Sequence, residues 1–71
     1  MKPLPYVGRC LLKQLLEQKR MTASELANKS EISLQRISDY KSNRRGMSLT
    51  NARKIAQVLN CYIDDLYDWS E

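Results

Sequence analysis

Apolar residues recur at spacings of three and four along most of this chain, which is the period of an amphipathic helix. The first run predicts a helix over residues 6–19 with the following apolar stripe: Val7, Leu11, Leu12, Leu15 and Leu16. The clearest run lies much further along the chain: Leu49, Ala52, Ile55, Ala56 and Leu59. No segment alternates between apolar and polar residues as a half-buried strand does, so the pattern favours an all-α fold.

Capping residues divide the chain between these two runs. Thr22 is a good N-cap, and Glu25 completes a capping box three residues later, so a second helix is expected from here to about residue 30. Ser33 can cap a third helix, which places Ile37 and Tyr40 on its inner face. The segment after it, residues 42–46, is rich in turn-forming and charged residues and is expected to be a loop.

The two ends of the chain complete the expected domain. Ser48 is expected to cap the fourth helix and Asn60 to end it in a left-handed conformation. A fifth, short helix is expected around Ile63, Leu66 and Tyr67. Residues 1–5 contain two prolines and are expected to form an extended arm. A chain of 71 residues is close to the smallest that folds around one core, so we expect five short helices in one domain over residues 6–71.

Charge is segregated along the chain. The net charge is +4, but residues 36–54 carry +5 and residues 55–71 carry −4. A basic region beside a candidate recognition helix is expected of a surface that binds nucleic-acid phosphates. A solvated helix face would give the same pattern, so charge alone leaves both interpretations open.

Several classes of protein are disfavoured by composition. Cys10 and Cys61 are too few and too far apart for a disulfide framework, which favours two free thiols in a reducing cytoplasm. There is no histidine and no glycine-rich phosphate loop, and the adjacent Asp64 and Asp65 cannot face each other as an acid and base pair. We therefore expect no enzyme activity, metal, cofactor or small-molecule ligand, and neither a signal peptide nor a membrane span.

The most informative pattern lies in residues 22–40. Two short helices are expected to meet there through a tight turn. Ala27 is small enough for them to cross closely, Ile32 fills the angle between them, and Ile37 anchors the second on the first. The outer face of the second helix is then free to enter a DNA major groove about 12 Å wide.

With this pattern in place, the chain resembles the Cro/C1-type (XRE-like) helix-turn-helix family of phage and bacterial repressors, from about Val7 to Trp69. The segments that carry the resemblance are Met21-Thr22, Glu25-Leu26-Ala27, Ile32-Ser33, Ile37-Ser38, Asn43-Arg44-Arg45 and Ala52 to Tyr67. The resemblance implies a lambda-repressor-like fold that binds double-stranded DNA and regulates transcription. It implies a repressor acting in the cytoplasm, at the nucleoid.

The resemblance also implies which residues touch DNA. The base-reading set carried over from the family is Ser33, Leu34, Gln35, Arg36 and Asp39. The set expected at the DNA backbone is Thr22, Ala23, Ser38, Lys41, Asn43, Arg44 and Arg45. In the major groove a glutamine can pair with adenine, a leucine can pack on a thymine methyl group, an arginine can reach guanine, and an aspartate can accept from cytosine.

Three positions depart from the family pattern. Ala23 replaces a glutamine that usually braces a phosphate, so only its backbone amide remains available. Glu31 stands where the turn usually has glycine. A usual Arg–Glu pair is replaced by Leu16 and Lys41, so Leu16 is expected to join the core and Lys41 to be free for phosphate.

The C-terminal segment leaves two interpretations open. A homodimer would have to use the last helix and tail, with Ile63, Tyr67 and Trp69 at the contact. Trp69 could equally pack on the edge of its own core. The rival function from another class is a protein-interaction module of the same fold, such as an antitoxin or a regulator's partner, acting through residues 55–71.

Overall fold

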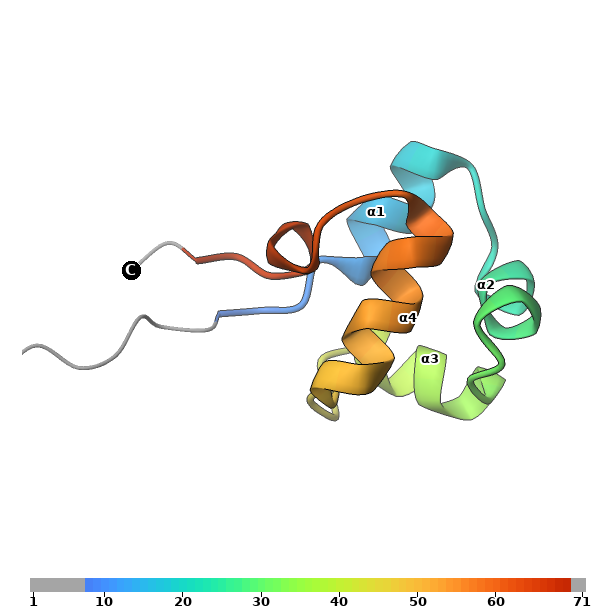
Figure 1. Ribbon diagram of the computed structural model, residues 1–71. Coiled ribbons are helices and arrows are strands. Elements are labelled where there is room, and N and C mark those ends of the chain that lie inside the picture. The colour runs from blue at the N-terminus through green and yellow to red at the C-terminus, as the bar shows by residue number, and fades with distance from the viewer. Residues whose placement is uncertain (1–7, 70–71) are drawn as a thin grey trace, which may run out of the picture.

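Four α-helices and one 3-10 turn make up the part of the chain that the computed structural model describes, residues 8–69. They are α1 (Leu12–Lys19), α2 (Ala23–Ser30), α3 (Leu34–Lys41), α4 (Leu49–Leu59) and the 3-10 turn η1 (Ile63–Leu66). Figure 1 shows α4 running through the middle of the molecule, with the other helices packed around it. The all-α prediction is confirmed, and the fifth expected helix is the single turn η1. The expected arm over residues 1–5 lies outside the described residues.

The first helix begins later than the sequence predicted. The apolar period suggested a helix over residues 6–19, but α1 begins at Leu12. Residues 8–11 lie outside the helix and pair with residues 66–68 through backbone hydrogen bonds of 2.7 and 2.9 Å. Because these backbone groups bond across to the other end of the chain, they cannot form a helical turn. Figure 1 shows the two segments leaving the helices side by side.

The core is aliphatic and draws on every helix. Its largest fully buried side chains are Tyr40, Leu12, Leu26, Ile37, Ile55, Leu59 and Leu66. Leu16 is also buried, as expected from its replacement of a charged residue. The buried Ser30 hydroxyl donates to the Leu26 carbonyl oxygen at 2.7 Å, so this polar group inside the core is satisfied. No helix of residues 8–69 is long and apolar enough to cross a membrane.

The predicted caps set the helix ends. The Thr22 hydroxyl accepts from the Glu25 N–H (3.1 Å), and the Glu25 carboxylate accepts from the Thr22 N–H (3.0 Å), which is the complete capping box. Ser33 and Ser48 cap α3 and α4 in the same way through their hydroxyl oxygens. Asn60 ends α4 with a φ of 54°, the left-handed conformation expected of it.

Two inward side chains fix the orientation of α3. Ile37 is fully buried, and Tyr40 is 1% exposed. The Tyr40 hydroxyl accepts from Nδ2 of Asn51 on α4 at 2.9 Å. The opposite face of α3 is therefore turned away from the core at a fixed angle.

Candidate nucleic-acid interface

A three-residue turn joins α2 to α3. Glu31 ends α2 with a φ of 61°, and Ile32 is 6% exposed between the two helices. Ser33 then begins α3 by accepting from the Arg36 N–H at 3.2 Å. The left-handed residue turns the chain sharply, so two short helices meet at an angle and one face of α3 stays free.

The outer face of α3 carries most of the predicted base-reading residues. Exposed residues on this face are Ser33, Leu34, Gln35, Arg36 and Ser38. Leu34 is an apolar side chain that keeps half of its surface exposed in the described part of the chain. Such a side chain is suited to contact with a thymine methyl group.

Asp39 differs from the other members of the set because its carboxylate is enclosed. Its side chain is 13% exposed. Gln35 donates to its Oδ1 from Nε2 at 3.2 Å. Arg44 Nη1 lies 3.8 Å from Oδ1, and Arg45 Nε lies 3.8 Å from Oδ2. The structure thus brings together two predicted base readers, Gln35 and Asp39, and two predicted phosphate binders, the arginines, around a single carboxylate.

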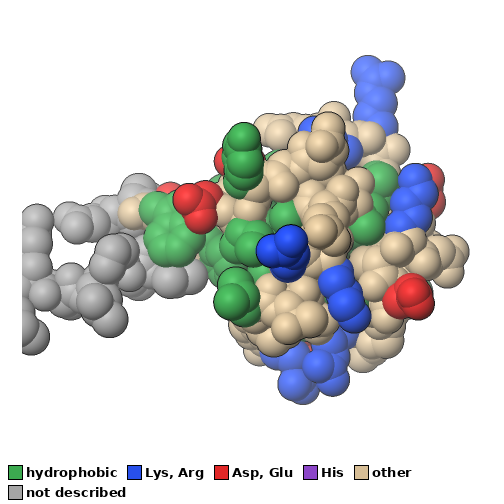
Figure 2. All heavy atoms as spheres, viewed as in Figure 1, with side chains coloured by type: hydrophobic (Ala, Val, Ile, Leu, Met, Phe, Trp, Pro, Cys, Tyr) green, Lys and Arg blue, Asp and Glu red, His purple; other side chains and the backbone are tan. Residues whose placement is uncertain are grey.

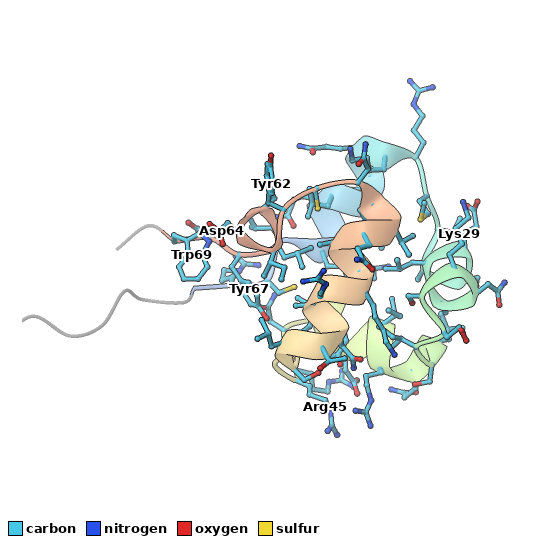
Figure 3. All side chains as sticks on the ribbon, in the orientation of Figure 1. Lys29, Arg45, Tyr62, Asp64, Tyr67 and Trp69 are labelled. Carbon is cyan, nitrogen blue, oxygen red and sulfur yellow. The ribbon has the colours of Figure 1, made fainter. Side chains whose placement is uncertain are left out.

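The two arginines of this cluster remain open to solvent. The side chain of Arg44 is 75% exposed and that of Arg45 is 59% exposed. Both ion pairs are long and exposed on the arginine side, so they contribute little to stability and do not remove the arginines from a ligand's reach. Figure 3 shows Arg45 pointing outward from the end of the molecule at which α3 and the following loop lie.

Asn43, predicted at the DNA backbone, has a second role. Its Oδ1 accepts from the Cys10 N–H at 2.7 Å, and its Nδ2 donates to the Cys10 carbonyl oxygen at 3.3 Å. Its own backbone N–H donates to Tyr40 at 3.2 Å. Asn43 therefore fastens the N-terminal segment to the loop after α3, and one amide hydrogen is left for a phosphate.

A basic hollow lies at the start of α2. Its wall includes Thr22 and Ala23 at the helix N-terminus, together with the three cationic residues Lys13, Arg20 and Lys41 and the acidic Glu17. The first amides of a helix have no intrahelical acceptor and favour an anion. Lys41 faces this hollow, which supports the expectation that it can reach phosphate.

Lys13 and Arg20 are candidate site residues that the sequence analysis did not single out. They are seven positions apart, a spacing of about two helical turns, which is the signal that could have placed them on one side of the first helix. Arg20 ends α1 two positions before Thr22, whereas Lys13 in the first turn of α1 comes to the start of α2 only through the fold, which a local pattern does not show.

Burial and hydrogen bonds shift several pKa values near the motif and the chain ends. The pKa of Glu25 is lowered, mainly by the hydrogen bond that its carboxylate accepts from the Thr22 backbone and to a smaller extent by the hydrogen bond with the Thr22 side chain. Burial raises the pKa of the Cys10 and Cys61 thiols and of the Tyr67 hydroxyl. Both cysteines are free thiols, as expected.

The 3-10 turn η1 and the residues after it carry their own group of acidic and aromatic side chains. Figure 2 shows blue side chains along the end of the molecule that contains α3, and green and red ones beside η1 and the C-terminal segment. Trp69 donates from Nε1 to the Asp64 carbonyl oxygen at 2.8 Å and meets Tyr67 edge to face, with ring centroids 6.1 Å apart. Figure 3 shows these three residues together, far from Arg45.

Two short crossed helices, a free face on the second, and cationic side chains around its C-terminal end and the start of the first define a helix-turn-helix DNA-binding protein. A family model of the Cro/C1-type HTH DNA-binding domain matches residues 11–71. The SPbeta prophage-derived uncharacterized HTH-type transcriptional regulator YopS of Bacillus subtilis (strain 168) is 36% identical over 64 residues, which cover 89% of this chain and 86% of that protein. The chain belongs to the Cro/C1-type HTH family and is a DNA-binding transcriptional regulator, so the resemblance read from its sequence is confirmed.

Proposed function

We propose that this protein is a sequence-specific repressor that occupies an operator and blocks access to a promoter, acting at the nucleoid. The observation that carries the proposal is the free outer face of α3. Its exposed polar and apolar side chains lie beside the basic hollow at the start of α2, which Lys41 also lines, and beside the arginines of the following loop. A helix placed in this way can lie in the major groove while the cationic side chains around it contact phosphates.

The base contacts follow from the chemistry of each side chain. Gln35 pairs with adenine, Leu34 packs on a thymine methyl group, and Arg36 reaches a guanine or a phosphate. The Ser33 hydroxyl accepts a backbone hydrogen bond through its oxygen, which leaves its hydrogen for a base edge. Asp39 has only a small exposed surface for a cytosine amino group, because three of its own side-chain neighbours surround it.

The backbone contacts fall into two groups. The basic hollow provides Lys13, Arg20 and Lys41 beside the Ala23 amide at the start of α2, because the Thr22 N–H already donates to Glu25. The second group is Ser38 on α3 with Asn43, Arg44 and Arg45 in the loop after it. These groups fix the register of α3 in the groove without reading sequence, because phosphates are the same at every step.

A homodimer through the C-terminal segment fits the arrangement. Tyr67 and Trp69 lie away from Arg45 (Figure 3), and Ile63 begins η1 just before them, so a second copy there would leave both α3 faces free. Trp69 packs on its own chain yet keeps 42% of its surface exposed, and the neighbouring Tyr62 is 81% exposed. Two copies related by a two-fold axis would read half-sites about ten base pairs apart.

The test is selection from random duplex DNA with the purified protein at near-physiological salt. The proposal predicts an enriched sequence, and a dimer predicts two half-sites about ten base pairs apart. Gln35→Ala should erase the preference at one base position, whereas Gln14→Ala, an exposed glutamine beside Tyr62 and Asp65, should leave the profile unchanged. Binding without any enriched sequence would contradict the proposal and favour the rival interpretation, a protein-interaction module that uses the exposed aromatic residues near η1.

A further inference from the structure

We infer that Asp39 is a positioning residue: it fixes the direction of the Gln35 amide and thereby makes Gln35 select adenine over guanine. This inference rests on the proposed function, because it assumes that the outer face of α3 reads bases. It concerns a residue that the sequence placed among the base readers and that the structure encloses instead.

The direction of the Gln35 amide follows from hydrogen-bond chemistry. Gln35 and Asp39 are four residues apart on α3, so their side chains are neighbours on one face. The Gln35 side chain lies 3.2 Å from Oδ1 of Asp39. An ionised carboxylate can only accept, so the end of the amide that faces it has to be the NH2 group. The amide oxygen, Oε1, then points away from Asp39.

Asp39 can impose this direction because it is fixed itself. Its side chain is 13% exposed, and the guanidinium groups of Arg44 and Arg45 lie 3.8 Å from its two oxygens. A half-turn of the Gln35 amide would bring Oε1 against a carboxylate oxygen, which replaces a hydrogen bond by repulsion between two acceptors. The enclosed carboxylate therefore acts as a stop against that half-turn.

The fixed amide matches one purine and not the other. In the major groove adenine presents the N6 donor and the N7 acceptor, whereas guanine presents two acceptors, N7 and O6. With one N–H given to Asp39, Gln35 has one N–H and Oε1 left, which complements adenine. Guanine has no donor for Oε1 on this edge, so Gln35 could make one hydrogen bond to it through the remaining N–H, and a second would require both N–H groups and the loss of the bond to Asp39.

The experiment compares base preferences of three proteins by selection and by competition between duplexes. Gln35→Ala first identifies the base position that Gln35 reads, as the position whose preference disappears. At that position the wild-type protein should prefer adenine over guanine. Asp39→Asn keeps the shape of the side chain but can present either a donor or an acceptor to Gln35. The adenine-to-guanine preference should then fall by about tenfold, the discrimination that one bidentate contact provides.

Charge requires a separate control. Asp39→Asn also removes a negative charge near the phosphates, so affinity for every sequence should rise, and only the ratio of the two purines is diagnostic. Glu31→Gln removes one exposed carboxylate from the same motif without touching Gln35. It should raise affinity for all sequences alike and leave the purine ratio unchanged.

The outcomes separate the inference from the proposed function. An unchanged purine ratio in a folded Asp39→Asn protein would overturn the positioning role and leave sequence-specific repression standing. If the wild-type protein preferred guanine at the base position that Gln35 reads, the positioning role of Asp39 would be overturned without any result from the Asp39 variant. If the wild-type protein enriches no sequence at all, the proposed function fails, and the inference fails with it.

Discussion

Four non-glycine residues of the described chain adopt a left-handed backbone: Arg20, Glu31, Asn43 and Asn60. Asparagine tolerates this conformation because its short polar side chain can bond locally, whereas a longer side chain is strained by about 1–2 kcal/mol. Glu31 bears this strain at the turn of the recognition motif, where the family usually has glycine. Its φ of 61° confirms the turn that the sequence predicted.

Replacing Glu31 by glycine should therefore stabilise the fold. Relief of the strain is partly offset by the greater freedom of glycine in the unfolded chain, which leaves a net gain of about 1 kcal/mol. For a domain of this size, that gain raises Tm by about 4–8 °C. Guanidinium and thermal unfolding measure it, with Glu31→Ala as the control that removes the charge but keeps the strain. A lower midpoint for Glu31→Gly would contradict the strain assigned to this turn.

Asn43 offers a second prediction at the scale of one side chain. Asn43→Gly keeps the left-handed backbone, with a φ of 60°, but loses both bonds to Cys10. The free energy of unfolding should fall by about 1–3 kcal/mol, because each of the two lost hydrogen bonds contributes about 0.5–1.5 kcal/mol. If chemical denaturation shows no loss while DNA affinity falls, the side chain serves phosphate binding and not the tie to Cys10.

Local chemistry made some residues predictable and others not. The caps Thr22, Ser33 and Ser48 were readable because each bonds to an amide three positions along the chain. The partner of Asn43 lies 33 positions earlier, so no local pattern could indicate it. Asp39 was correctly placed on the helix, but its enclosure depends on how the following loop turns back, and this also required the structure.

At the scale of elements, the start of α1 shows where periodicity misleads. Residues 7–11 fit the apolar spacing of a helix, yet the described part of this segment pairs with residues 66–68 instead. Cys10 and Tyr67 are partners in this bridge, and burial places both side chains partly inside the protein. An apolar residue fits the buried stripe of a helix and a buried β-bridge equally well. Whether such a segment forms a helix or a bridge therefore depends on a partner that is distant in the sequence.

This pairing predicts a loss of stability in alkali. Burial raises the pKa of Cys10 above its ordinary 9.0 and that of Tyr67 above its ordinary 10.0. When the pKa of a group is higher in the folded protein than in the unfolded chain, its stabilisation is complete at a pH below the unfolded-chain pKa. That stabilisation is lost as the pH rises through the folded-protein pKa. The free energy of unfolding should therefore fall above about pH 9, and less steeply in Cys10→Ala. If the free energy of unfolding, measured with urea, falls equally steeply with pH in the wild-type and Cys10→Ala proteins, the Cys10 thiol is excluded as a cause.

At the scale of the whole molecule, the chain separates its charges. The basic residues of the loop lie beside α3, and the acidic residues of η1 lie with the aromatic ones at the other end (Figures 2 and 3). The sequence predicted this separation from charge counts alone. What it could not provide was the contribution of Lys13, since this residue joins the basic hollow only through the fold, in which α1 packs on α3 and α4.

The charge arrangement predicts how single arginines act. Arg44→Ala and Arg45→Ala should each weaken binding to all sequences alike and reduce the salt slope of log affinity by about one. Arg53→Ala is the matched control, because this exposed arginine lies with Tyr62 and Asp64 beside η1. Fluorescence anisotropy over a range of salt concentrations measures both quantities. If Arg53→Ala weakened DNA binding more than the Arg44 and Arg45 variants do, the DNA would lie beside η1 and not beside α3.

DNA is expected to lie against the outer face of α3, the basic hollow at the start of α2 and the loop after α3, and amide chemical shifts of the labelled protein during titration with duplex DNA test this claim most directly. The account predicts the largest changes in residues 22–24, 33–36 and 43–45, with small changes in residues 62–69. Because backbone contacts also form with nonspecific duplex, this result does not depend on knowing the operator. Changes centred on η1 and residues 62–69, with α3 unaffected, would contradict the claim.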